Sequence, residues 1–198
     1  MTPELGPADA AMDRYAAGEA SAFAIVYDEV APRVLRFVRR QIRDAALAEE
    51  IVQETFSCMH RARGTFIPGS RVLPWAFAIA RRLTIDEHRR GRRNVLRRAA
   101  SVDDFEALSA DAPADEVFAA RQLAAELADG LSALPPAQRR SFELLRLEGL
   151  SHAEAAEVLG TSVTAVKLRA HRAYVALRAR LSPKSGDGSV TEGLTHER

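Results

Sequence analysis

The chain has 198 residues, in which 28 Lys and Arg residues nearly balance 27 Asp and Glu residues for a formal net charge of +1. This length allows one domain or two small ones, and the only cysteine, Cys58, excludes an internal disulfide and any cysteine-based zinc site. The sequence has neither a signal-peptide pattern nor an apolar run long enough to cross a membrane, so we expect a cytoplasmic protein.

Apolar residues recur at helical spacing along the chain, without the alternating Val, Ile or Thr runs that indicate a sheet, so the predicted fold is all-α. A first helix is expected from Ser21, a possible N-cap, through Val30. Pro32 then restarts a helix that carries Val34 and Ile42. The two apolar stripes predict two helices that each pack by one face.

A third helix is predicted after Asp44, with two faces of opposite character. Its apolar face contains Leu47, Ile51, Val52, Thr55, Phe56 and Met59, and its polar face contains Glu49, Glu50, Gln53 and Glu54. The polar face points either at solvent, as in any surface helix, or at a partner. Cys58 lies beside the apolar face, which favours an inert, partly buried thiol over a redox sensor.

Residues 64–71 predict a loop because Gly64, Pro68, Gly69 and Ser70 interrupt the helical pattern. Pro74 suits the first turn of the next helix, which is expected to end near Gly91. We place a first domain at residues 14–98.

Charge divides the middle of the chain sharply. Residues 81–98 carry eight arginines against Asp86 and Glu87, whereas residues 101–116 carry six acidic residues and no basic one. Arginine is suited to binding phosphate and base edges, although a high-GC coding bias also enriches it. Residues 99–116 are therefore expected to be a flexible acidic linker.

The second expected domain covers residues 117–182, and residues 183–198 are expected to be a disordered tail. Leu123, Leu127 and Leu131 predict one helix, and a second runs from Pro136 until Gly149 ends it.

Residues 150–181 have the layout of a helix-turn-helix. Ser151 and Glu154 form a capping-box pattern at the start of a short helix, residues 152–159. Gly160 can adopt the left-handed conformation that ends this helix, and Thr161 or Ser162 can cap the next one. Such a motif places its second helix in the major groove of DNA.

The second helix is expected to pack by one face and to present the other outward. The packed face is predicted to contain Val163, Val166, Ala170, Tyr174, Leu177 and Leu181. The outward face contains Thr164, Ala165, Lys167, Leu168, Arg169, His171 and Arg172, and residues 161–181 include no acidic residue. This face suits a phosphate-lined groove, the alternative being a solvated amphipathic helix.

Three blocks, EEIVQETF at 49–56, PWAFAIARRLTIDEHRRGRR at 74–93 and the segment 134–181, together resemble the extracytoplasmic-function (group 4) sigma factors of bacterial RNA polymerase. The resemblance implies two helical domains, sigma regions 2 and 4. It implies that Glu49, Glu50, Gln53 and Glu54 bind the clamp helices of the polymerase beta-prime subunit. It also implies −10 element contacts by Phe66, Trp75, Arg81, Arg82, Asp86, Arg89, Arg90, Arg92 and Arg93, and −35 element contacts by Thr164, Lys167, Leu168, Arg169, His171 and Arg172.

Some residues depart from the family's pattern, which limits how far the family's DNA contacts can be assigned to this chain. Arg82 stands where the family usually has Asn, and Leu168 stands where a small polar residue is common, so promoter preference is expected to be unusual. Trp75 is more readily interpreted as a core residue than as a stacking platform for an extruded base. The family further implies an anti-sigma factor as a partner and a narrow stress or signalling regulon.

The sequence contains no phosphate-binding glycine loop, metal-ligand cluster or catalytic triad pattern, so neither an enzyme nor a cofactor is expected. Two other functions remain as alternatives. An ordinary helix-turn-helix regulator would explain the C-terminal half alone, and an adaptor or anti-sigma-like protein would not need the basic helix.

Overall fold

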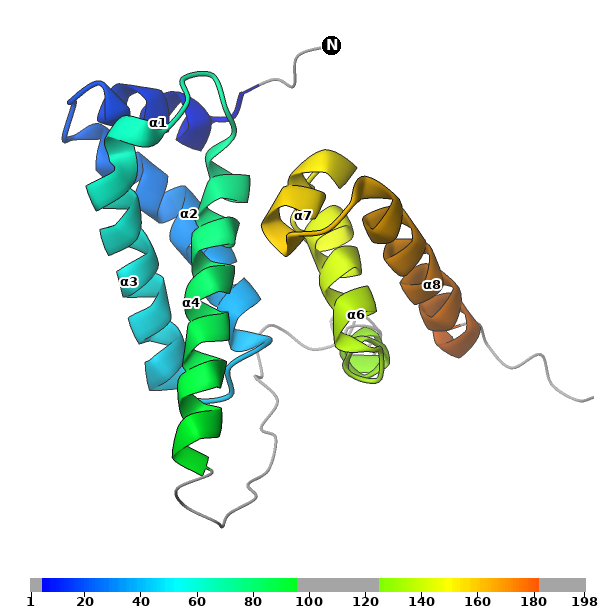
Figure 1. Cartoon of the computed structure of the whole chain (residues 1–198). Coiled ribbons are helices and arrows are strands. Elements are labelled where there is room, and N and C mark those ends of the chain that lie inside the picture. Colours follow the sequence, from blue (N-terminus) through cyan, green and yellow to red (C-terminus); the bar gives the residue numbers. More distant parts are fainter. Residues whose placement is uncertain (1–4, 96–124, 182–198) are drawn as a thin grey trace, which may run out of the picture.

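The computed structural model describes residues 5–95 and 125–181, with side chains described outside 91–95 (Figure 1). Every regular element in these ranges is a helix, as predicted. The expected linker at 99–116 and tail at 183–198 lie outside the described residues. The elements are α1 (Pro7–Ala16), α2 (Ala22–Arg39), α3 (Ala45–Ala62), the 3₁₀ turn η1 (Arg63–Thr65), α4 (Val72–Val95), a helical segment at 125–132, α6 (Pro136–Phe142), the π-helix η2 (Glu143–Leu147), α7 (His152–Leu159) and α8 (Val163–Leu181).

Helix α1 was not expected from the sequence. It buries Ala11, Met12 and Tyr15, which pack against the other N-terminal helices. One oxygen of the Asp9 carboxylate accepts a hydrogen bond from Gly6 N at 2.9 Å, and the other accepts one from Val72 N at 2.8 Å. Asp9 therefore caps two helices at once, because the first-turn N–H groups of a helix lack partners within it.

Helix α2 is continuous through Pro32, so the predicted restart of the helix at this residue was wrong. The reason is tertiary packing, because Val26, Val30, Val34 and Phe37 form one buried stripe on both sides of the proline. The ring of Pro32 itself lies on the exposed face. Burial of this stripe outweighs the lost backbone hydrogen bond.

Helices α3 and α4 complete the N-terminal half. The Asp44 side chain caps α3 by accepting a hydrogen bond from Leu47 N at 3.1 Å, and the predicted apolar face is buried. Helix α4 begins two residues before Pro74, as its place in a first turn requires, but it continues past Gly91 to Val95. The expected end near Gly91 was therefore wrong, since a single glycine weakens a helix without stopping it.

The helix-turn-helix forms as the sequence predicts. Ser151 Oγ accepts a hydrogen bond from Glu154 N at 3.2 Å, and a Glu154 carboxylate oxygen accepts one from Ser151 N at 2.6 Å. Gly160 takes the left-handed conformation with φ of 58°. Ser162 Oγ then caps α8 by accepting from Ala165 N at 3.2 Å. These local interactions fix the turn between the two helices.

The packed face of α8 differs from the prediction. Its buried residues are Val166, Ala173 and Leu177, whereas Tyr174 and Val163 are exposed. The end of α8 packs against Leu131 and Leu134 in a small cluster of its own, and this contact selects the stripe through Ala173. The aromatic ring of Tyr174 is left at the surface.

The two halves of the chain share one apolar core. The largest buried cluster joins residues of α1 to α4 with Leu144, Leu150, Val158 and Leu159 of the C-terminal half. Helix α7 lies against α4 (Figure 1). The helix-turn-helix is thus packed on the N-terminal helices through α7. We call this arrangement of the two halves closed.

Candidate nucleic-acid and polymerase interfaces

Helix α8 presents a cationic surface to solvent. Lys167, His171 and Arg172 are exposed, and Arg169 is half-buried. Thr164 and Leu168 are also exposed, Leu168 at 48%. All six residues predicted to contact the −35 element therefore lie on one helix and are reachable by a ligand. A helix with this surface can contact both phosphates and base edges.

The second half of α4 carries another cationic surface, and part of it is paired internally. Arg82, Arg89 and Arg90 are exposed. Arg89 pairs with Asp86 at 3.7 Å, and Arg90 pairs with Glu87 at 3.6 Å. Such exposed pairs are weak, so phosphate groups can compete for these guanidinium groups. The side chains of the other two predicted residues, Arg92 and Arg93, lie outside those described.

An aromatic pair links the loop after η1 to α4, because Phe66 of the loop packs against Trp75 of the helix. Their ring centroids are 5.3 Å apart, Phe66 is buried and Trp75 is partly buried against the main core. This packing agrees with the interpretation of Trp75 as a core residue. The neighbouring Ile67 is 70% exposed and was missed by the sequence analysis. A single exposed aliphatic residue is common on protein surfaces, so no sequence signal marked Ile67.

The acidic face of α3 is accessible, since Glu49, Glu50, Gln53 and Glu54 are all exposed. Arg39 donates to Glu49 at 2.9 Å, and Arg61 donates to Glu54 at 2.6 Å. The Arg61 hydrogen bond, with a smaller contribution from the Cys58 thiol, lowers the pKa of Glu54. Glu54 therefore keeps its negative charge, and the exposed face can bind a basic partner surface.

Ion pairs join the two halves of the chain. Arg33 Nε lies 3.1 Å from Glu148 Oε2, and Arg33 Nη2 donates to the Glu148 carbonyl oxygen at 2.6 Å. Arg40 lies 3.6 Å from the same carboxylate and 3.9 Å from that of Glu143. Both carboxylates are almost fully buried. We call this set, Arg33, Arg40, Glu143 and Glu148, the interdomain latch.

A second ion pair closes the interface beside α7. Arg71 lies 3.2 Å from a carboxylate oxygen of Glu154, the residue that also caps α7. The sequence analysis missed all of these interactions. Glu143 and Glu148 stand among leucines in ELLRLEGL, but no local pattern shows that their carboxylates are buried or which arginines pair with them.

Arg81 is not free for DNA in this closed arrangement. It is half-buried, and its guanidinium lies beside the turn at Gly160. Burial lowers the pKa of Arg81, and burial together with the positive charge of Arg81 lowers the pKa of Arg140 on α6. The predicted −10 contact residue Arg81 therefore faces the C-terminal half.

The described residues contain no cluster of His, Cys, Asp or Glu that could hold a metal ion. Within the same part of the chain, no helix is both long and apolar enough to cross a membrane.

Comparisons with known proteins agree on the class. Residues 26–94 match the family Sigma-70 region 2, and residues 124–177 match Sigma-70, region 4. The chain is 36% identical to RNA polymerase sigma factor CarQ of Myxococcus xanthus, over 86% of this chain and 95% of that protein. It is 33% identical to ECF RNA polymerase sigma factor SigK of Mycobacterium ulcerans, over 90% and 97% of the two chains.

Solved structures with the same fold include two protein complexes. Sigma factor RpoE, crystallised with the anti-sigma factor NepR from Bartonella quintana, has a TM-score of 0.67 and 22% identity, over 82% of this chain and 98% of that one. CnrH in complex with the cytosolic domain of CnrY has a TM-score of 0.61 and 25% identity, over 91% and 100%.

The helix-turn-helix, the cationic helices and these matches define a transcription initiation factor, a class of proteins that is not catalytic. The chain belongs to the ECF family of RNA polymerase sigma factors. It is a promoter-recognising alternative sigma factor.

Proposed function

We propose that α8 reads the −35 element, that the loop after α3 and the helix α4 engage the −10 element, and that α3 binds core RNA polymerase. The observation that supports this best is the capped helix-turn-helix, whose second helix exposes Lys167, His171 and Arg172 without a nearby acidic residue on that helix. In this motif the second helix enters the major groove. Arg89 and Arg90 then contact backbone phosphates.

The loop between α3 and α4 contributes an apolar surface to −10 recognition. Ile67 stands out from it next to the aromatic pair of Phe66 and Trp75. An unpaired base that leaves the stack needs an apolar or aromatic surface to cover its face. We assign Ile67 this covering role and assign Phe66 and Trp75 the support of the loop.

Promoter binding requires the two halves to separate. The numbers in their names place the −10 and −35 elements about 25 base pairs apart. This separation corresponds to about 85 Å of duplex at about 3.4 Å per base pair. Helices α4 and α7 are in contact here. We therefore assign this structure to the resting state and the extended form to the polymerase-bound state.

Core polymerase and an anti-sigma factor are the proposed protein partners. Glu49, Glu50, Gln53 and Glu54 supply an exposed acidic face for the clamp helices of the beta-prime subunit. The complex of the sigma factor RpoE with the anti-sigma factor NepR supports an inhibitory partner for this chain. Control by an anti-sigma factor implies that the protein acts on a stress or signalling regulon. Because its promoters lie on the chromosome, the protein acts in the cytoplasm.

The test is footprinting with and without core polymerase on promoter DNA selected by the holoenzyme. A sigma factor opens the −10 region only with core polymerase, a repressor protects duplex alone and an adaptor protects neither. The double substitution Arg89→Ala and Arg90→Ala should weaken binding to all promoters. It should also lower the salt slope by about 0.9 for each phosphate that is no longer neutralised, or about 0.7 on single strand. An unchanged slope would mean that Arg89 and Arg90 are solvent-exposed residues that do not contact phosphate.

A further inference from the structure

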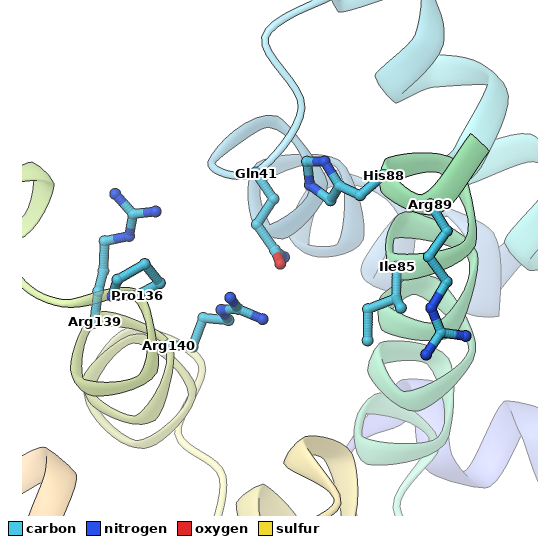
Figure 2. Close-up of a pocket in the computed structure, with 7 residues that line it drawn as sticks. All are labelled: Gln41, Ile85, His88, Arg89, Pro136, Arg139 and Arg140. Atoms are coloured by element: carbon cyan, nitrogen blue, oxygen red, sulfur yellow. The ribbon is translucent and has the colours of Figure 1, made fainter. Parts of the chain in front are cut away.

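A crevice of about 460 Å³ lies between the two halves of the closed protein. Gln41, Ile85, His88 and Arg89 line it from the N-terminal half, and Pro136, Arg139 and Arg140 line it from α6 (Figure 2). Arg140 extends from α6 into the gap, toward Gln41 and Ile85 (Figure 2). The volume of the crevice falls within the range of small-ligand sites.

The charges around this crevice are unbalanced. Arg89, Arg139 and Arg140 are three of the seven residues that line it, and no carboxylate is among the described residues that do so. Two carboxylates outside the lining act on these arginines: Asp86 pairs with Arg89, and the buried Glu143, which pairs with Arg40, also attracts Arg139 and Arg140. At the crevice, arginines therefore outnumber the carboxylates that act on them.

Two guanidinium groups at this end of the interface lack full hydrogen bonding. The Nε atoms of Arg81 and Arg140 are buried and have no hydrogen-bond partner in the described part of the chain. Burial and the charges of Arg81 and Arg139 both lower the pKa of Arg140. Closing the protein thus costs free energy here, and an anion with several oxygen acceptors would offset that cost.

We propose that this crevice binds a ligand with consecutive phosphate groups and that the bound ligand holds the two halves together. Arginine matches this chemistry because its planar fork of donors pairs with phosphate oxygens in two-point contacts. Since α4 and α6 supply opposite walls, the ligand binds the closed form and not the separated one. By mass action it shifts the protein toward the closed form.

Consecutive phosphates can come from a free polyphosphate or from the backbone of single-stranded DNA. The proposal commits to the free ligand, because DNA that engages both elements requires the separated halves. Inorganic tripolyphosphate and a short single-stranded oligonucleotide are therefore the two probes, each titrated into the full chain by calorimetry at low salt.

We expect saturable 1:1 binding of tripolyphosphate. Arg140→Ala and Arg139→Ala should each lower its affinity about tenfold, the worth of one charge-assisted hydrogen bond. The matched control Arg36→Ala removes an exposed arginine of α2 and should bind as the parent does. Arg33→Ala, which weakens the latch outside the crevice, should also bind less tightly, and tripolyphosphate should return its radius of gyration to the parental value.

Four results would each overturn the proposal. Binding could fail to saturate, or Arg36→Ala could lose as much affinity as Arg140→Ala, which would indicate general charge attraction. Sulfate at equal ionic strength could compete as well as tripolyphosphate. Lastly, the crevice variants could lose the oligonucleotide and keep tripolyphosphate, which would make this a DNA surface. Circular dichroism shows whether each variant is folded. If Arg140→Ala does not fold, Arg139→Ala replaces it as the crevice variant.

Discussion

Arg33 on α2 contacts both the side chain and the backbone of Glu148, a residue 115 positions later in the chain. The carboxylate that it pairs is only 1% exposed. A carboxylate with this burial is stable only because the guanidinium groups of Arg33 and Arg40 offset the cost of removing it from water. The contact therefore couples closure of the protein to one pair of residues.

Replacing Arg33 by alanine should open the protein. The substitution leaves Glu148 buried with Arg40 alone, which should cost the closed form about 3 kcal/mol, on the order of a 100-fold shift toward separated halves. Small-angle scattering should show a larger radius of gyration, whereas Arg36→Ala should not change it. Adding Glu148→Gln to Arg33→Ala should recover part of the loss, because position 148 then no longer buries a carboxylate that has lost one of its two arginine partners. A compact Arg33→Ala protein would contradict this role of the latch.

The ionisation of Glu143 should lower the stability of the closed protein as the pH rises. Burial raises the pKa of Glu143 above 4.5, against the lowering effect of Arg40, Arg139 and Arg140. A carboxyl group whose pKa is higher in the folded protein binds its proton more tightly there. Its ionisation therefore destabilises the folded protein between pH 4.5 and the raised pKa.

Glu143→Gln should remove this component of the pH dependence. The melting temperature of the variant relative to the parent should rise as the pH increases from 4.5 through the raised pKa, since only the parent acquires the buried charge. Differential scanning calorimetry at several pH values measures it. A difference between the two proteins that does not vary with pH would mean that Arg40 keeps Glu143 ionised throughout.

Charge reversal on α3 should separate polymerase binding from DNA binding. Glu50→Lys and Glu54→Lys should each weaken binding to core polymerase while −35 duplex binding by the rest of the chain is retained. Loss of the exposed Glu54 pair with Arg61 should cost little stability. The control Glu29→Lys reverses an exposed charge on α2. Equal loss of polymerase and duplex binding in a folded Glu50→Lys protein would refute the modular assignment.

The outward face of α8 should carry sequence preference near its start and general affinity further along. Alanine at Lys167 or Arg169 should change the preferred −35 sequence by about 1 to 3 kcal/mol of discrimination, whereas alanine at Arg172 should lower affinity for all sequences. Selection from randomised −35 duplexes measures both. Recovery of the parental preference by the Lys167 and Arg169 variants would mean that α8 docks in another register.

Local sequence signals predicted the helix-turn-helix in detail. The cap at Ser151, the left-handed Gly160 and the start of α8 depend on residues three or four apart, so the sequence alone determines them. Surface position was also predictable for the acidic face of α3. The identity of the residues that contact DNA or polymerase stays a prediction.

Features that depend on distant residues could not be predicted in the same way. Whether α2 continues through Pro32 depends on the core beneath it, and the stripe of α8 that is buried depends on its contact with residues 131 and 134. Arg33 and Glu148 resemble ordinary charged residues until the two halves meet. The half-buried state of Arg81 likewise follows from closure, which no local pattern encodes.

The π-helix η2 makes the length of the chain itself a determinant of closure. Glu148 N donates to Glu143 O at 3.0 Å, a bond that spans five residues where an α-helix spans four. Removing one residue from 143–147 would let an ordinary α-helical turn form. Everything after it would then rotate by about 100° about the helix axis. Glu148 and α7 would turn away from α2 and α4, so a one-residue deletion that keeps all four latch residues, such as that of the exposed Leu147, would disengage the two domains.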